Sequence, residues 1–477
     1  MMIFPKNRRR ITGIMMSFCL LISCIAGCAS GIPGSAASVP EETDRTAAGF
    51  LPGEYDWPTE PGSDRYAGRT LRILLTIGGG GNYYEPVARR MMEYYPGLTV
   101  ELNYTSGAGD VLRTEVLAQN APDIFNCNSG DLPHYSAIRQ GICAPIDPVF
   151  DVPTLDGSGR IGDLLDMDMM RNGSVDGSCY IFYDLSYICG LWYDANWFAA
   201  NHLPVPDDWE SLQELAVSCD AIGADVLGAC GLMSHEYPTQ YWWWPMVIST
   251  DKDLYADLTN LRYEAFKSPS MRRVVDKMLW LRDNGYYDTE TNGMGNAETQ
   301  MAFIDHDFAL LPCGAWLEIE MADAWTPDWQ LSFLPYSFGD TQGHTYYRSD
   351  ALASMISSTT ENMDLVCEFY RFLFSDPASI RGSVAIHTNV YRIPGFDEQY
   401  SDLLSPSVKD ALETCREMTP FTPLAGIWYP GLNAGIGDMI VALMGGDISG
   451  DEFIERGYEL FRQIAEDDSI PKYRYEP

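Results

Sequence analysis

Positive charge is scarce in this sequence. Its 477 residues include 31 Lys and Arg against 67 Asp and Glu, which gives a formal net charge of -36 at pH 7. A surface of this sign repels the phosphates of nucleic acids and anionic lipid headgroups. We therefore expect no nucleic-acid partner and no membrane attachment through basic patches.

The short motifs of several enzyme classes are also missing. The chain has six His and contains neither a His-Glu-x-x-His pattern nor a Gly-x-Ser-x-Gly elbow. The spacing of Asp251 and Asp253 resembles the start of a calcium-binding loop, but Tyr255 and Arg262 occupy positions at which such a loop needs calcium ligands. We predict no catalytic residue, no metal site and no cofactor.

Cysteines are neither dense nor paired in the sequence. Of the twelve, three lie within the first 28 residues, and the other nine are scattered without a Cys-x-x-Cys spacing. An odd and scattered set favours neither a disulfide scaffold nor a zinc module. We predict that most of the nine are small buried side chains.

Long apolar runs are rare, and the one that stands out lies at the N-terminus. Four basic side chains precede residues 11–27, which carry no charge, as in the n-region and h-region of a secretory signal. The run ends in Ile-Ala-Gly-Cys, which is similar to the bacterial lipobox, so Cys28 is the predicted lipidation site; a weaker match ends at Cys24. An uncleaved anchor is the alternative, although a membrane span needs roughly 20 apolar residues. Either way, we expect the remainder outside the cytoplasm.

Strands and helices alternate after a tether that the Gly, Pro, Ser and Thr content predicts at residues 29–66. An apolar strand at 70–76, a helix at 86–94 and a strand at 98–104 form a β-α-β unit, whose strands we expect to be parallel. A further helix and a short buried strand are expected at 110–119 and 121–125.

The chain is organised around an extended stretch at residues 175–198. Asp176 and Gly177 predict a turn, and the aromatic and β-branched residues that follow predict extended chain. The residues before this stretch are typical of one α/β lobe, and those after it of a second. A strand that crosses between two lobes is a place where a cleft can form and a hinge can bend.

Helix starts are predicted in the second half of the chain. Asp207 and Glu210 have the spacing of a capping box, and Ser268 stands before Pro269 where an N-cap belongs. The remaining expected elements are an extended return at 348–356, a helix at 362–374 and a last helix that starts at Ser449.

A set of segments, taken together and in order, carries a family resemblance: 93–100, 121–125, Asp176-Gly177, 191–198, 206–212, 303–316 and 375–377. They resemble the extracellular solute-binding proteins of bacterial ABC importers, the sugar-binding group that includes maltose-binding protein. The chain departs from the family at Tyr193-Asp194-Ala195, where Tyr-Asn-Lys is usual, and at residues 306–310, where Gly-Lys-Ala-Ala-Met is usual.

The resemblance implies an α/β fold of the two-lobed periplasmic-binding-protein type II, with a hinged cleft between the lobes. The boundaries that we expect are a lipoprotein signal peptide at 1–28, the tether at 29–66, a first lobe at 67–184 and 349–397, and a second lobe at 185–348 and 398–477.

Aromatic side chains are the leading candidates for the second lobe's share of a site, because the apolar faces of a sugar lie well on rings. By the resemblance, Trp316 after Gly314-Ala315 is the family's stacking tryptophan; a core role is the alternative. Trp242, Trp243 and Trp244 are consecutive and cannot all face one way, so we expect at most one or two of them to face the cleft and the others to lie in the core. The other candidates of this kind are Trp428, Tyr429 and, at the hinge, Tyr187.

Loop tips after the strands supply the first lobe's candidates. Turn formation, helix capping and packing are the alternative roles for these residues. Residues 78–81 are four glycines, but they lack the Gly-Lys-Ser/Thr ending of a phosphate loop, so we interpret them as a turn. The candidates are Asn82, Tyr83, Asn128, Ser129 and Asp131.

The resemblance therefore implies a lipoprotein that binds a carbohydrate, an oligosaccharide in our prediction, and delivers it to an ABC importer permease. It would be a monomer without enzymatic activity, held by its lipid on the outer face of the bacterial cytoplasmic membrane. A solute-binding protein for a peptide or polyamine is the nearer alternative. A secreted glycoside hydrolase is the more distant one, since no pair of carboxylates is singled out.

Overall fold

A parallel β-α-β unit builds the first lobe of the computed structural model, which describes residues 50–76, 82–126, 134–231, 236–341, 343, 345–386, 390–391, 393, 395–429 and 431–475. Strand β1 (Thr70–Thr76) pairs in parallel with β2 (Thr99–Thr105) on one side and with β3 (Ile124–Asn126) on the other. Helix α1 (Tyr84–Tyr94) connects β1 to β2 and buries the face that carries Val87, Met91 and Tyr94. The predicted unit and its parallel pairing are confirmed.

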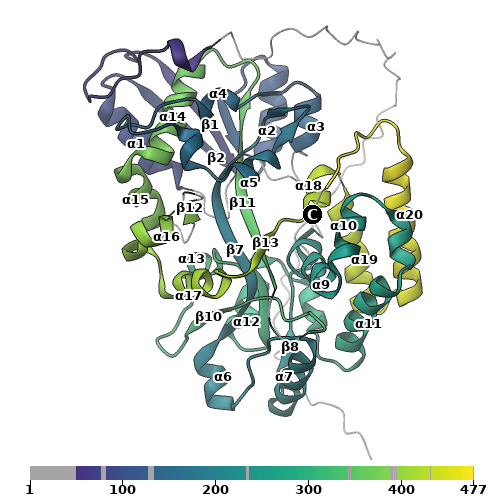
Figure 1. Cartoon of the computed structure of the whole chain (residues 1–477). Helices are drawn as coiled ribbons and strands as arrows, with labels where there is room; N and C mark the ends of the chain where they lie inside the picture. Colours follow the sequence, from purple (N-terminus) through teal and green to yellow (C-terminus); the bar gives the residue numbers. More distant parts are fainter. Residues whose placement is uncertain are drawn as a thin grey trace, which may run out of the picture. The chain divides into compact units, whose positions relative to one another are not determined.

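Two long strands continue from the first lobe into the second. Strand β7 (Phe182–Asp194) pairs antiparallel with β11 (Tyr346–Ser357), and Figure 1 shows the two side by side between the lobes. One end of β11 pairs with β3, whereas the far half of β7 pairs with β9 (Phe308–Gly314). The predicted crossing strand is confirmed, and because both strands are continuous the lobes belong to one compact unit.

The register of this crossing is irregular at one point. The pairing of β11 with β7 shifts between Leu352 and Ala353. A bulge bends a strand and increases its local twist. The main sheet order is β2-β1-β3-β11-β7-β9-β8; in addition, β4 and β13 pair with β11, and β10 and β12 pair with β7.

The first lobe contains further helices and short strands. They are α2 (Ala108–Leu117), α3 (His134–Arg139), β4 (Cys143–Ala144), α4 (Asp147–Phe150), η3 (Ile161–Leu164), α5 (Met167–Arg171), β5 (Ser174–Val175), β6 (Ser178–Cys179), α14 (Met363–Ser375), α15 (Pro377–Ile386), β12 (Val390–Tyr391), α16 (Phe396–Gln399) and η7 (Ser401–Leu403).

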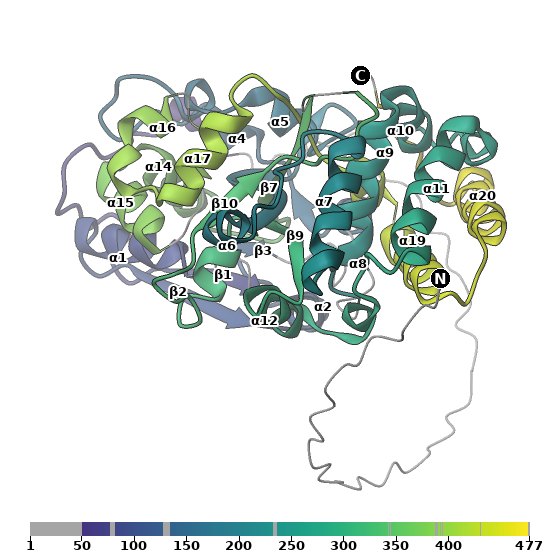
Figure 2. The same cartoon turned by 90° about the horizontal axis from the view of Figure 1, so that it is seen from below.

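The second lobe is richer in helices, and α9, α11, α19 and α20 pack together at one side of it (Figure 2). Its elements are α6 (Ala195–Asn201), α7 (Trp209–Ile222), β8 (Asp225–Leu227), α8 (Glu236–Pro238), η4 (Thr239–Trp243), α9 (Trp244–Thr250), α10 (Lys252–Thr259), η5 (Tyr263–Lys267), α11 (Pro269–Asp283), η6 (Thr289–Gly293), α12 (Asn296–Ile304), α13 (Leu317–Glu320), β10 (Leu331–Leu334), α17 (Pro406–Cys415), β13 (Thr419–Phe421), α18 (Leu424–Trp428), α19 (Leu432–Gly445) and α20 (Gly450–Glu466).

The third passage between the lobes lies between η7 and α17. Helix η7 contacts α15 of the first lobe, whereas α17 packs on β10 of the second. The chain therefore changes lobe near residues 404–405, a few residues beyond the boundary expected at 397–398.

Residues 50–66, which we define as the strap, differ from the tether expected there. The strap begins with η2 (Pro52–Glu54) and buries Trp57 and Tyr66, which are 9% and 0% exposed. Arg371 of α14 donates to the carbonyl of Pro58 at 2.8 Å, and the strap lies beside α1 and α14 in Figure 1. Its four aromatic side chains, at 50, 55, 57 and 66, all belong to the hydrophobic core or pack against it, so this segment is part of the folded body.

Local helix signals are largely confirmed. Ser268 accepts a hydrogen bond from the Met271 amide, and Ser449 forms a capping box with Glu452. Helix α7 starts one residue later than predicted, because its capping box joins Asp208 and Ser211. Spacing alone did not distinguish two consecutive aspartates.

All eight cysteines within the described residues are buried, as predicted; Cys127, like Cys28, lies outside them. Across the same described ranges, no helix has both the length and the apolar character that a membrane span requires.

Candidate functional site at the strand crossing

Trp316 lies two residues after the end of β9 and directly before α13, and its side chain is half-buried. A Cβ atom on Gly314 would lie 2.0 Å from the Trp316 ring, so the indole folds back over that glycine. The Gly-Ala-Trp sequence is therefore a local requirement, because no other residue type at 314 leaves room for the ring.

Two tyrosines meet Trp316 edge to face. The ring centroids of Tyr187 and Trp316 are 5.1 Å apart at 90°, and those of Tyr241 and Trp316 are 5.5 Å apart at 78°. We call Tyr187, Tyr241 and Trp316 the aromatic corner. Tyr187 is buried on β7, whereas Tyr241 and Trp316 are half-buried, so part of each of these two rings is open to solvent.

Tyr241 belongs to a π-helical turn. Element η4 has i to i+5 hydrogen bonding, an irregularity that is frequent at functional sites. It joins α8 to α9 and presents Gln240 and Tyr241 half-buried, while the residues that follow are buried. Tyr241 was not among the predicted site residues, although it directly precedes the three tryptophans that were considered.

The three consecutive tryptophans lie in the core. Trp242, Trp243 and Trp244 are 0%, 1% and 0% exposed. Trp242 stacks on Tyr287 and Trp243 on Phe266, with centroids 5.4 and 6.3 Å apart. The expectation that Trp242 or Trp243 faces a solute is thus not met in this conformation, because Tyr241 is the outward residue of the turn.

A buried arginine supports the corner from β11. The guanidinium carbon of Arg348 lies 3.7 Å from the centroid of the Tyr241 ring, and Nη2 donates to Gln240 Oε1 at 2.9 Å. Arg348 is 1% exposed. Arg348 was not among the predicted site residues; a single cation within the otherwise uncharged start of a crossing strand was the available signal.

Helix α13 is hydrogen-bonded to residues 405–407, which follow the third point at which the chain crosses between the lobes. Glu318 Oε2 accepts hydrogen bonds of 2.6 Å from the hydroxyls of both Ser405 and Ser407. Ser405 also caps α17. The segment that carries Trp316 is therefore in contact with β7 and with residues 405–407.

Trp428 and Tyr429 are buried, at 7% and 1% exposure, rather than open to solvent. Trp428 Nε1 donates to the hydroxyl of Tyr135 at 3.1 Å, which links α18 of the second lobe to α3 of the first. The Tyr429 hydroxyl accepts from the Tyr473 amide at 3.1 Å. In this conformation these rings connect parts of the protein, and their expected contact with a solute stays a prediction.

The first-lobe candidates divide into two groups. Tyr83 is 3% exposed, and its carbonyl accepts from the Ser383 hydroxyl at 2.6 Å, so it packs against α15. Asn82 is exposed before α1. The other three, Asn128, Ser129 and Asp131, lie outside the described residues.

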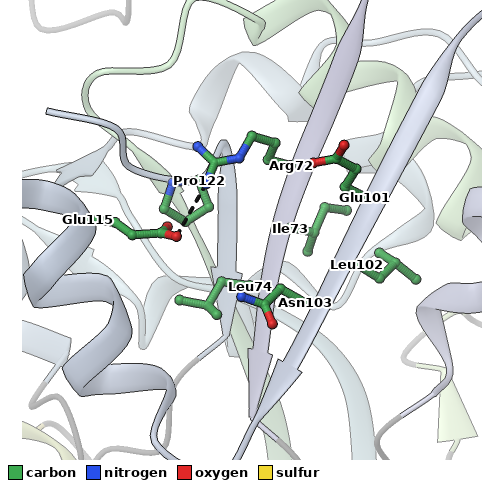
Figure 3. A pocket seen from close by; sticks show the side chains of 8 residues that line it. All are labelled: Arg72, Ile73, Leu74, Glu101, Leu102, Asn103, Glu115 and Pro122. Atoms are coloured by element: carbon green, nitrogen blue, oxygen red, sulfur yellow. Dashed lines mark hydrogen bonds and ion pairs between the residues drawn. The ribbon is translucent and has the colours of Figure 1, made fainter. Parts of the chain in front are cut away.

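A hollow with a volume of about 320 Å³ lies elsewhere in the first lobe. Figure 3 shows the side chains that line it. Arg72 Nη2 and Glu115 Oε1 form an ion pair at 3.3 Å beside it. None of the candidate residues named above lines the hollow, so we leave it out of the candidate site. Its lining residues are Arg72, Ile73, Leu74, Glu101, Leu102, Asn103, Glu115 and Pro122.

A thiol and a phenol lie buried next to the corner. Tyr237, whose ring lies 4.4 Å from that of Tyr241, donates its hydroxyl to Cys313 Sγ at 3.1 Å. Burial raises the pKa of Cys313 to about 12 and the pKa of Tyr237 well above its ordinary value. Both groups stay protonated at neutral pH. Within the described residues, no group of three or more His, Cys, Asp or Glu side chains could hold a metal ion.

Comparison with known proteins gives three findings. The family model described as bacterial extracellular solute-binding protein matches residues 77–380. The chain is similar to the diacetylchitobiose binding protein NgcE of Streptomyces coelicolor, with 21% identity over 323 residues, 66% of this chain and 67% of that protein.

Solved structures share the fold. Apo RafE from Streptococcus pneumoniae superimposes with a TM-score of 0.64 at 18% identity, over 86% of this chain and 99% of RafE. RafE in complex with raffinose gives the same TM-score over 83% of this chain and 99% of that one, at 18% identity. A chitin oligosaccharide binding protein gives 0.67 at 16% identity, over 83% of this chain and 98% of that one.

Proposed function

Because this chain belongs to the bacterial extracellular solute-binding protein family, we propose that it captures a carbohydrate, specifically an oligosaccharide, for an ABC importer. The observation that carries the proposal is the aromatic corner. Trp316 and Tyr241 are half-buried beside the strand that joins the lobes, and the apolar faces of a sugar ring lie well on such rings.

The proposal includes binding without catalysis. A solute-binding protein closes its lobes on a solute and leaves every covalent bond intact. The protonated Cys313 and Tyr237 beside the corner support this, since neither is an activated nucleophile. Release of reducing sugar by the purified protein over hours would contradict it and favour the hydrolase alternative.

Attachment and delivery are the remaining parts of the proposal. The N-terminal run that ends at Cys28 supports a lipid anchor on the outer face of the cytoplasmic membrane, and a loaded monomer would dock on its permease there. Replacing Cys28 with Ala should move the protein from the membrane fraction to the soluble fraction, because the proposed lipid is attached to this side chain and is lost with it.

A thermal-shift screen followed by calorimetric titration tests the function. The panel begins with diacetylchitobiose, raffinose and chitin oligosaccharides, the sugars that the names of the similar proteins give, and also contains polyamines and peptides. A solute at a hundredfold excess over its Kd stabilises the folded state by about 2.7 kcal/mol.

We expect a saccharide to raise the melting temperature and Trp316→Ala to weaken its binding at least tenfold. Trp209→Ala is the matched control, because Trp209 is also half-buried but packs on Trp280 of α11. If only polyamines or peptides raise the melting temperature, the proposed ligand is not a carbohydrate and the alternative solute class applies.

A further inference from the structure

Arg348 belongs to the crossing strand and not to the helices of the second lobe. Its backbone pairs with Cys189 of β7, two positions along that strand from Tyr187. Because the side chain is 1% exposed, it does not reach a solute in this conformation. Any role that it has in binding must therefore act through other residues.

Both of its contacts described above go to the π-helical turn η4. The guanidinium carbon lies over the ring of Tyr241, 3.7 Å from its centroid, which is close enough for a cation–π interaction. The same group donates to Gln240 Oε1 at 2.9 Å. A planar guanidinium can stack and donate at once, whereas the ammonium of lysine is a point charge on a flexible stem.

Tyr241, which Arg348 contacts, is itself in contact with Trp316, the first candidate residue of the site. Tyr241 meets Trp316 at 5.5 Å and 78°, and both rings are half-buried. A rotation of Tyr241 would open space on one side of Trp316. The orientation of the open ring surface thus depends on a cation that stays inside the protein.

We propose that Arg348 is a positioning residue for the binding site, which orients Tyr241 and through it Trp316 from the strand that crosses between the lobes. The inference rests on the proposed function in one respect, that the corner binds a solute. The orientation of the rings is a property of the unliganded protein and is tested separately below.

The test uses protein labelled with 5-fluorotryptophan, in which fluorine NMR resolves the twelve tryptophans. The Trp316 resonance is identified by its loss in Trp316→Phe. In Arg348→Met we expect this resonance to move while that of Trp329 stays in place, because Trp329 stacks on His306 and not on the corner. Arg348→Lys should restore the resonance only in part.

Binding is then measured with the saccharide found by the screen. We expect Arg348→Met to weaken binding at least tenfold, and Arg348→Met combined with Tyr241→Leu to cost less than the two changes added separately. If no saccharide binds the wild type, the proposed function fails and the NMR result alone decides the positioning role.

Two results would overturn the inference. One is an unmoved Trp316 resonance in folded Arg348→Met; the other is full additivity with Tyr241→Leu. Should Arg348→Met fail to fold, Gln240→Ala replaces it, since this change removes one acceptor from η4 and leaves the arginine in place. The Trp316 resonance must then move in Gln240→Ala, and an unmoved one rejects the role.

Discussion

At the scale of a residue, the missing side chain of Gly314 determines where the indole of Trp316 lies. A Cβ atom there would approach the ring to 2.0 Å, and real Cβ contacts under 3.0 Å essentially never occur. Either the indole or the end of β9 has to move when this space is filled. The glycine therefore belongs to the candidate site, although it has no side chain to contact a solute.

We predict that Gly314→Ala lowers the affinity for the saccharide at least tenfold, because the displaced indole no longer presents the same face. Calorimetric titration measures this. Gly107→Ala is the control, since a Cβ atom at Gly107 meets nothing within 4 Å. Equal affinities of Gly314→Ala and wild type would show that the position of the ring is not critical.

At the scale of an element, α14 is unusual in burying an ion pair. Glu368 and Arg371 are both 0% exposed, and Arg371 Nη1 donates to Glu368 Oε1 at 3.2 Å. Burial, opposed by the arginine, raises the pKa of Glu368 from 4.5 to about 7. A carboxyl group whose pKa is higher in the folded protein than in the unfolded chain stabilises the folded state. This stabilisation is complete at pH values below the pKa of the unfolded chain, and it is lost as the pH rises toward 7.

The stability of wild type relative to Glu368→Gln should therefore fall between pH 4.5 and pH 7, by about 3 kcal/mol. Urea unfolding of both proteins across this range measures the difference. Glu413→Gln, which alters an exposed pair with Arg416, is the control. A difference that does not change with pH, or that grows as the pH rises, would refute the raised pKa.

The strap is the second element with a measurable role. It buries Trp57 and Tyr66, and the Gly62 amide donates to the Tyr94 carbonyl at 2.8 Å. Burying a large aromatic side chain contributes roughly 2 kcal/mol. A protein that starts at residue 67 should thus be about 4 kcal/mol less stable than one that starts at residue 50. If the two unfold at the same urea concentration with the same slope, the strap does not stabilise the first lobe.

At the scale of the whole molecule, the proposed function requires that a solute changes the relative orientation of the two lobes, which the chain connects three times. A ligand shifts such an equilibrium only through contacts that differ between the two states. We predict that the saccharide reduces the radius of gyration measured by small-angle X-ray scattering. Trp316→Ala at the same saccharide concentration should show no reduction, and a contraction that persists in this variant would remove Trp316 from the closing contact.

The sequence by itself determined the local features. The strand at 70–76, the crossing strand, the caps at Ser268 and Ser449 and the burial of the described cysteines were all predicted, since each depends on neighbours in the chain or on simple apolar pattern. Matching segments in the right order along the chain were also sufficient to suggest the family, whose fold the comparisons then confirmed.

Only the tertiary structure decided which aromatic rings remain open to solvent. Trp242 and Tyr241 are adjacent and chemically alike, yet one is sealed in the core and the other reaches Trp316, because a π-helical turn sets their directions. Arg348 contacts residues more than a hundred positions away, and the strap depends on α14, three hundred positions later. Such contacts arise from packing between distant segments, which no local pattern encodes.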